Sequence, residues 1–336
     1  MIHANQYLQS LEMTRMMLGD GRYRKVVCST MPEIEGSLPL VAEGLLDECI
    51  YGMPISENLL PRLRSLSEKI KIDLLVDNPQ QLEFLERSDK RWGVFVKIDV
   101  GARRAGLTAG SSGLNELVQK LEACAQVDLV GFYCHANHSY ACRDENDTKN
   151  MLQHEVESVL EAASLLAPTR KLQLSIGATP TAHVIKSLRA SIPSNISLEL
   201  HAGNFPTNDL QQVSTNTVTL SDQAVRIGAD IISIYPERNE ALINAGVIVL
   251  ARETSAFTGH GKMINRPAWD VVRVSQEHGI LGTNASDEKV EEAFRVGQRV
   301  WLWCQHSCIS AAAFYVYYVV DKNDIVVDSW VPWKGW

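Results

Sequence analysis

Gly93-Val-Phe-Val-Lys-Ile-Asp-Val100 and Val127-Asp-Leu-Val-Gly-Phe-Tyr-Cys-His135 are two nearly continuous apolar runs, and they decide the fold. Runs of this length are typical of parallel strands that are buried on both faces. Between them, residues 114–124 have the apolar spacing of an amphipathic helix. Parallel neighbours need a crossover connection, and a helix is its usual form. The segment therefore predicts a strand–helix–strand unit.

The same alternation continues on both sides of this unit. Five further strand-like runs occupy residues 25–30, 48–51, 73–77, 171–176 and 197–201. Helical stretches occupy residues 58–69, 150–166 and 182–188. A closed barrel of alternating strands and helices has eight strands, whereas seven are counted here, and the helix predicted at residues 7–18 has no strand before it. We therefore predict an α/β fold, a TIM-type (β/α)8 barrel that lacks its first strand. A seven-stranded open sheet is the alternative.

The pattern of predicted strands and helices changes after residue 220. Strand-like runs recur there without long helices, at residues 224–235, 241–251, 271–276, 299–304, 314–321 and 325–330. This pattern indicates a C-terminal, mostly antiparallel β domain. We therefore expect a barrel domain at residues 1–220 and a β domain at residues 221–336.

Composition excludes several classes of protein. The formal net charge of −8 argues against nucleic-acid and anionic-membrane binding. No apolar run approaches the roughly 20 residues of a membrane span, and the first residues do not resemble a secretory signal. The seven cysteines are scattered and odd in number, which favours reduced thiols in the cytoplasm.

In a barrel of this class the loops that follow the strands carry the chemistry. Asp99-Val-Gly-Ala-Arg-Arg-Ala-Gly106 supplies Arg103 and Arg104 as donors for an anionic group. The next predicted strand ends in Tyr133-Cys-His-Ala-Asn-His-Ser-Tyr140, whose His135 and Tyr140 suit acid–base chemistry or contact with a cofactor. The alternatives are an ordinary surface turn and satisfied core histidines.

Two glycine turns follow the last two predicted strands. In Ser175-Ile-Gly-Ala-Thr-Pro-Thr181, Gly177 permits a tight turn and Thr179 offers a hydroxyl at the start of a helix, an arrangement that suits a phosphate. Gly203 and Asn204 bring open backbone to the same edge from the neighbouring strand. A Thr-capped helix without a ligand is the alternative.

The C-terminal half contains Cys304-Gln-His-Ser-Cys308. On an extended segment His306 and Cys308 point the same way, and an imidazole with a thiolate suits Zn²⁺. Glu277-His278 is a second polar pair that we expect near such a metal. The alternative is that His306 and Cys308 are core residues of a β domain.

Taken together, these motifs resemble the family of D-serine dehydratases and D-threonine aldolases, which are pyridoxal-phosphate (PLP) enzymes with a barrel and a β domain. The resemblance covers nearly the whole chain from about Ser10 and includes the closing Trp333-Lys-Gly-Trp336. The segment at residues 235–246 resembles the eukaryotic D-serine dehydratase branch.

The resemblance implies a set of roles. It implies a homodimer that converts D-serine to pyruvate and ammonia with PLP and Zn²⁺. The metal ligands would be His306 and Cys308. The residues that it implies for the cofactor are Arg104, His135, Tyr140, Gly177, Thr179, Gly203 and Asn204.

The sequence departs from the family at two places. The family's Schiff-base lysine precedes a segment like Ser10–Arg15, where this chain has His3-Ala-Asn-Gln-Tyr-Leu-Gln9 and no lysine. Lys25 and Lys97 are the nearest cations, but both belong to predicted strands. Phe205 stands where the family usually has a tyrosine. We therefore expect little dehydratase activity from this polypeptide. A D-threonine aldolase-like lyase and a non-catalytic PLP- or metal-binding relic remain as alternatives.

Overall fold

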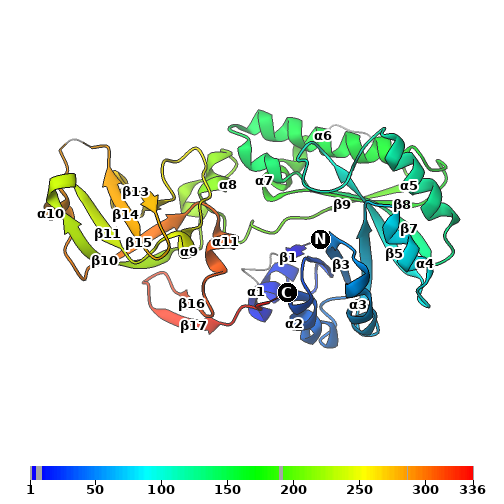
Figure 1. Cartoon of the computed structure of the whole chain (residues 1–336), viewed down its shortest axis with the longest axis horizontal. Coiled ribbons are helices and arrows are strands. Elements are labelled where there is room, and N and C mark those ends of the chain that lie inside the picture. The colour runs from blue at the N-terminus through cyan, green and yellow to red at the C-terminus, as the bar shows by residue number, and fades with distance from the viewer. Residues whose placement is uncertain (1, 5–9, 189–191, 286, 336) are drawn as a thin grey trace. The chain divides into compact units, whose positions relative to one another are not determined.

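The computed structural model describes residues 2–4, 10–188, 192–285 and 287–335 of the chain (Figure 1). The chain divides into two compact units. Unit 1 contains Met1–Ser139, Asn146–Gly203 and Tyr317–Trp336, and unit 2 contains Tyr140–Glu145 and Asn204–Val316. The division at residue 220 that the sequence suggests stays a prediction.

A nine-stranded sheet forms the centre of unit 1 (Figure 1). Its main strands are parallel throughout and follow the order β1-β2-β3-β4-β5-β7-β8-β9, with β6 paired to β5. Their bounds are β1 Ile2–Ala4, β2 Lys25–Cys28, β3 Glu48–Pro54, β4 Lys71–Val76, β5 Trp92–Asp99, β6 Leu107–Thr108, β7 Val127–Cys134, β8 Leu172–Ile176 and β9 Ile196–Leu200. All seven strands predicted from the sequence are present and in order, so the predicted fold class is confirmed.

One detail of that prediction is wrong. The first helix does have a strand before it, because Ile2–Ala4 pairs in parallel with Val26–Cys28 of β2. Three residues are too few to produce a recognisable apolar run, and only their pairing identifies them as a strand. Residues 5–9, which include most of the segment where the family has its lysine, lie outside the described residues.

Helices connect the parallel strands. They are α1 Leu11–Leu18, α2 Met31–Ala42, η1 Glu57–Leu59, α3 Leu60–Leu66, α4 Gln80–Glu86, α5 Ser112–Ala123, η2 Asn137–Ala141, α6 Glu145–Ala163, α7 Thr179–His183 and η3 Ile185–Ser187. Buried apolar residues of the strands and of these helices form one large core. None of the helices in the described part of the chain has the length and apolarity that crossing a membrane requires.

The other face of the sheet has its own small apolar cluster. It contains one residue from each of five neighbouring strands, namely Val27, Ile50, Leu75, Phe95 and Tyr133. Side chains alternate along a strand, so these residues share the face opposite to the helices. The concave side of the curved sheet is therefore a packed interior.

An ion network lies at the start of the strands. The Lys25 ammonium on β2 is 2.9 Å from Glu48 on β3 and 4.0 Å from Glu199 on β9. β2 and β9 stand near opposite ends of the strand order, so the sheet must curl to bring Lys25 and Glu199 this close. Burial raises the pKa of Glu199, and the Lys25 charge opposes that shift.

A six-stranded antiparallel barrel forms the centre of unit 2 (Figure 1). It closes in the order β10-β11-β14-β13-β12-β15, with bounds β10 Ile227–Tyr235, β11 Glu240–Ile243, β12 Gly261–Met263, β13 Trp269–Val274, β14 Gly279–Thr283 and β15 Arg299–Cys304. The helices of this unit are α8 Leu210–Ser214, η4 Leu220–Asp222, η5 Pro236–Arg238, α9 Val247–Leu250, α10 Val290–Ala293 and α11 Ser307–Ala311. The predicted antiparallel β domain is confirmed.

The strand predicted at residues 241–251 is wrong in its second half. The chain leaves β11 and forms the short helix α9, whose first N–H groups bond to the Ser275 and Gln276 carbonyls. Gly246 makes this approach possible, because a Cβ there would lie 2.1 Å from the Ser275 carbonyl oxygen. The apolar sequence fits a strand equally well, so only this tertiary contact distinguishes the two.

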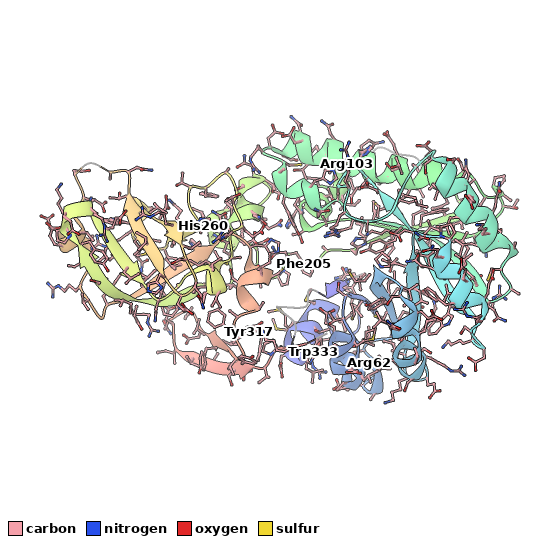
Figure 2. All side chains as sticks on the ribbon, in the orientation of Figure 1. Arg62, Arg103, Phe205, His260, Tyr317 and Trp333 are labelled. Carbon is pink, nitrogen blue, oxygen red and sulfur yellow. The ribbon has the colours of Figure 1, made fainter. Side chains whose placement is uncertain are left out.

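The end of the chain belongs to unit 1. A hairpin of β16 (Tyr317–Val320) and β17 (Val326–Trp330) precedes Trp333, which Figure 2 labels. The Trp333 indole lies directly on Gly36 of α2, where a Cβ would come within 2.3 Å of it. The last residues are therefore anchored on one of the first helices.

Gly131 on β7 is where the sheet tolerates no side chain. A Cβ there would lie 1.8 Å from the Gln173 carbonyl oxygen on β8, and a backbone atom cannot move aside without displacing its strand. We predict that Gly131→Ala lowers the free energy of unfolding by about 1–3 kcal/mol. Gly113→Ala is the control, because its nearest neighbour would be 3.8 Å away and alanine favours a helix. Equal urea denaturation midpoints for the two variants would contradict this.

Candidate functional site

The loops that follow β5, β7, β8 and β9 carry the predicted barrel residues. Parallel strands end at the same edge of a sheet, so these loops leave unit 1 at one edge. Arg104 follows β5, His135 follows β7, Gly177 and Thr179 follow β8, and Gly203 follows β9. The strand order therefore brings these loops to one edge, and the role of their residues stays a prediction.

The turn that carries Arg104 is built on Asp99. One carboxylate oxygen of Asp99 accepts the N–H groups of Gly101 and Arg103, both at 3.0 Å. Asp77 accepts the N–H of Gly106 at 3.0 Å from the neighbouring strand end. The Arg104 side chain is exposed, and its charge adds to the effect of burial in lowering the pKa of Lys97.

His135 and Gly177 contact each other directly. The His135 Nδ1 atom lies 2.8 Å from the Gly177 carbonyl oxygen, which can only accept, so Nδ1 carries the proton. Gly177 has a φ of +132°, and a Cβ there would lie 2.4 Å from the His201 carbonyl oxygen. The loops after β7, β8 and β9 are therefore packed together at this glycine.

A buried carboxylate on α6 joins two of these loops. Glu155 Oε1 accepts the N–H of Gly177 at 3.1 Å and that of Ala136 at 3.3 Å. The Ala178 N–H donates to the Thr181 hydroxyl at 3.0 Å. Two of the N–H groups that the sequence predicts for a phosphate are therefore used within the protein. Thr179 begins α7 and is 1% exposed.

The interior of the sheet holds a column of polar side chains just below this edge. The Lys97 Nζ atom lies 4.2 Å from the centre of the Tyr133 ring, and that ring stacks on His201 at 4.5 Å. Ser175 Oγ is 3.1 Å from His201 Nδ1. Burial, helped by the Arg104 charge, lowers the pKa of Lys97 to about 7. A substantial share of this amine is therefore neutral near pH 7.

In unit 2, two predicted residues lie side by side. The ring of Tyr140 meets that of His306 edge-on, with centres 5.7 Å apart and planes at 74°. His306 lies between β15 and α11, directly before the first residue of α11. Its Nδ1 lies 2.6 Å from Gln211 Oε1. From the sequence, Tyr140 was predicted to contact PLP and His306 to bind zinc. The contact between the two residues was not predicted.

The predicted geometry of the His306–Cys308 pair needs correction. Only His306 is extended, and Cys308 lies in the helix α11. The two side chains are therefore not related by strand alternation. Cys308 is 3% exposed. Glu277 and His278 are exposed in the turn between β13 and β14, whereas the residues that contact His306 are Gln211 and Tyr140.

The Asn204 side chain is part of a buried network in unit 2. Its amide nitrogen donates to Asp209 at 2.5 Å, and its oxygen accepts from the hydroxyls of Thr207 and Ser307, each at 2.8 Å. A ligand contact by Asn204 would therefore have to use its backbone. Phe205, the departure from the family pattern, is 39% exposed.

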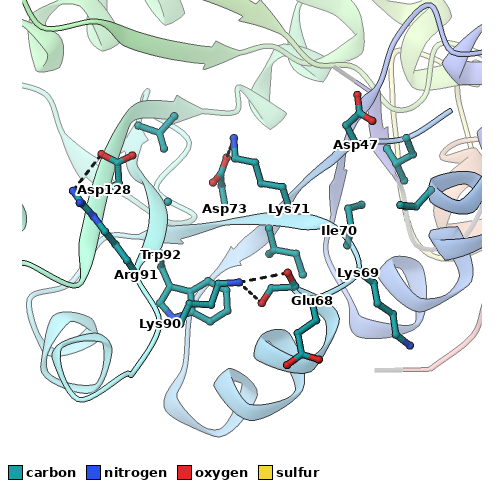
Figure 3. Close-up of a pocket in the computed structure, with 16 residues that line it drawn as sticks. Asp47, Glu68, Lys69, Ile70, Lys71, Asp73, Lys90, Arg91, Trp92 and Asp128 are labelled. Carbon is teal, nitrogen blue, oxygen red and sulfur yellow. Dashed lines mark hydrogen bonds and ion pairs between the residues drawn. The ribbon is translucent and has the colours of Figure 1, made fainter. Parts of the chain in front are cut away.

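A large cavity of about 860 Å³ lies elsewhere in unit 1 (Figure 3). Its lining includes Lys71, Trp92 and Asp128, which stand at or next to the first residues of β4, β5 and β7. It is therefore at the edge opposite to the functional loops. Four of its charged residues form ion pairs, Arg91 with Asp128 at 3.8 Å and Lys71 with Asp73 at 3.5 Å.

Four residues of these clusters were not assigned from the sequence. Their signals were nonetheless present. Lys97 lies two residues after the interior residue Phe95 in an otherwise apolar strand, so the two side chains share one face. Glu155 lies between Leu152 and Val156 in the buried part of its helix. Tyr133 and His201 occur in the quoted strand ends, but their stacking depends on strands that are distant in sequence.

Glu155 should make stability depend on pH. Burial raises its pKa to about 7, so the fold favours the neutral acid. The stability from this group is complete below the unfolded pKa of about 4.3 and is lost as the pH rises towards 7. Glu155→Gln stays neutral, so we predict that wild type loses on the order of 2 kcal/mol relative to this variant between about pH 5 and pH 8.

Urea denaturation across that pH range measures the difference. Glu157→Gln is the control, because Glu157 is exposed on the same helix and pairs with Gln153. Parallel stability curves for wild type and Glu155→Gln would disprove the predicted titration.

Known proteins resemble this chain over most of its length. Residues 2–190 match the family model "Alanine racemase, N-terminal domain", and residues 224–320 match "Putative serine dehydratase domain". The D-serine dehydratase of Schizosaccharomyces pombe is 40% identical, over 98% of this chain and 83% of that protein. The D-serine dehydratase of Saccharomyces cerevisiae is 34% identical, over 93% and 81%.

A solved structure supports the fold independently. The D-threo-3-hydroxyaspartate dehydratase from Delftia sp. HT23 superposes with a TM-score of 0.82 at 20% identity, covering 99% of this chain and 90% of that one. The parallel strands with their edge loops and the antiparallel barrel agree with this likeness. The chain therefore belongs to the D-serine dehydratase family of lyases.

Proposed function

We propose that this protein is a D-serine ammonia-lyase that uses PLP and Zn²⁺ to form pyruvate and ammonia. The observation that carries the proposal is the packing of His135, Gly177 and His201 at the edge where the parallel strands end, above the amine of Lys97. Barrel enzymes place their reacting groups at this edge. Family membership gives the reaction class, and this edge gives it a location in unit 1.

The residues of unit 1 fit a PLP site. The Tyr133 hydroxyl is a buried polar atom with no hydrogen-bond partner among the described residues, although such atoms are nearly always satisfied. The Tyr133 ring that carries this hydroxyl contacts the Lys97 amine, whose pKa is lowered, on the interior of the sheet. The same ring stacks on His201. In unit 1 we propose Arg104, His135, Gly177, Thr179 and Gly203 as cofactor-binding residues. The same role for Tyr140 and Asn204, which belong to unit 2, stays a prediction.

PLP, when bound, supplies an electron sink for the carbon that loses its proton. The chain's own groups do the remaining work. His135 carries its proton on Nδ1, so the lone pair of its neutral ring is on Nε2. Burial, helped by the charge of Arg104, lowers the pKa of Lys97 and keeps part of that amine neutral. Glu155 holds the two loops from which His135 and Thr179 extend.

The donor set of unit 2 fits zinc. His306 donates its Nδ1 proton and so keeps a lone pair on Nε2, and Cys308 contributes a thiol. We propose these two residues as the metal ligands. A zinc ion with two protein ligands supplies a Lewis acid with open positions, which would make the β-hydroxyl of D-serine a better leaving group.

The first experiment compares reaction products. We propose that the 336-residue polypeptide alone forms little pyruvate, because residues 3–9 contain no lysine. We predict that replacing residues 3–9 by the corresponding segment of the S. pombe relative raises pyruvate release from D-serine by several orders of magnitude. A coupled pyruvate assay with added PLP and zinc measures this difference.

The same assay separates the alternatives. Glycine and acetaldehyde from D-threonine, without pyruvate from D-serine, would replace the dehydratase proposal with an aldolase. Ready pyruvate formation by the 336-residue polypeptide would overturn its proposed inactivity. Failure of both polypeptides, with PLP bound, would support a non-catalytic relic.

The second experiment tests the metal ligands. We predict that His306→Ala and Cys308→Ala each reduce bound zinc well below one per chain, because each removes half of the protein donor set. Elemental analysis after dialysis measures the zinc content. His278→Ala is the control, since this histidine is exposed in the β13–β14 turn. Equal zinc in wild type and the double variant would refute the assignment.

We also propose a homodimer in the cytoplasm. All seven cysteines are buried, as thiols in the cores of reduced proteins commonly are. Light scattering at the mass of one chain, or recovery of the protein outside the cytosolic fraction, would reject these two statements respectively.

A further inference from the structure

The imidazole of His306 is the last member of a hydrogen-bonded chain in unit 2. His306 Nδ1 lies 2.6 Å from Gln211 Oε1. The amide nitrogen of Gln211 donates to Glu253 Oε2 and to the Thr254 carbonyl oxygen, both at 3.1 Å. Gln211 is only 7% exposed, so water competes little for these bonds.

The direction of this chain follows from which groups can donate. A carboxylate and a carbonyl oxygen can only accept, so the NH2 of Gln211 must face Glu253 and Thr254. Its oxygen then faces His306, whose Nδ1 must carry the proton. The lone pair of the neutral imidazole is consequently on Nε2. The tautomer is fixed by the network and does not depend on how the amide was oriented.

The backbone that carries both partners is held as well. Asp209 Oδ1 accepts the Gln212 N–H at 2.9 Å at the start of α8, and Asp209 Oδ2 accepts the Ser307 N–H at 2.9 Å at the start of α11. The Gln211 N–H donates to the Gln305 carbonyl oxygen at 3.1 Å. One carboxylate and one backbone bond thus fix the residues on either side of the His306–Gln211 contact.

We propose that Gln211, held by Glu253, is the positioning residue for the metal ligand His306. It keeps the Nδ1-protonated tautomer and the ring orientation in which Nε2 presents its lone pair to Zn²⁺. The inference rests on the zinc site proposed above. Loss of such a partner behind a ligating histidine typically weakens metal binding 10–100-fold.

The test uses the full chain with zinc alone as the ligand. We expect Gln211→Leu to weaken the zinc Kd 10–100-fold in competition with a chromophoric chelator. Gln223→Leu is the matched control, because Gln223 is also buried in unit 2 and bonds to the Leu220 carbonyl, outside the network that holds His306. This control should stay within about threefold of wild type.

A second measurement does not depend on metal. The ¹⁵N chemical shifts of the metal-free protein should show His306 as the Nδ1-protonated tautomer in wild type and as a mixture in Gln211→Leu. If Gln211→Leu does not fold, Glu253→Ala tests the same chain from a half-buried position and should weaken zinc binding severalfold.

The outcomes separate the two claims. Zinc binding that is tight and equal in wild type, Gln211→Leu and Glu253→Ala overturns the positioning role. Absence of His306-dependent zinc in wild type overturns the metal site, while the tautomer shift still decides whether Gln211 positions the ring. An unchanged tautomer in Gln211→Leu overturns the inference whatever the metal does.

Discussion

The shared direction of the strands in unit 1 is the constraint on which the candidate site depends. Every main strand of the sheet is parallel to its neighbours, so each chain reversal is made by a connection that crosses the sheet. The residues that leave β5, β7, β8 and β9 must then emerge at the same edge. His135, Gly177 and His201 come from three strands and contact one another because of this rule. The parallel topology, more than the local sequence, therefore brings these three residues together.

Both units use the same device to hold a site in place. In unit 1, Glu155 accepts two N–H groups from loops that follow different strands. In unit 2, Asp209 accepts N–H groups at the start of two different helices. A buried carboxylate needs such donors to offset its desolvation, and loops without regular structure have N–H groups to satisfy. The carboxylates and the N–H groups of the loops therefore satisfy one another.

Much of the fold could be predicted from the sequence. Apolar runs identified all seven longer parallel strands, because burial on both faces leaves a strong signal. The three-residue β1 and the helix α9 were missed, since both depend on tertiary contacts that short apolar stretches do not encode. Within the site, the residue types alone identified the glycine turns and the histidines. The partners of His306 and Asn204 were not, because Gln211 and Ser307 lie about one hundred residues away from them in the chain.

The path of the polypeptide between the two units affects how the protein is made. Unit 1 contains the first 139 residues and also residues 317–336, which end with Trp333 on Gly36. Domains usually fold in order as synthesis proceeds, with the N-terminal one first. Here residues 317–335 of unit 1 are synthesised only after all of unit 2 has been made. The α2 surface around Gly36 therefore stays uncovered until unit 2 has been synthesised, so unit 1 cannot finish folding before unit 2 is made.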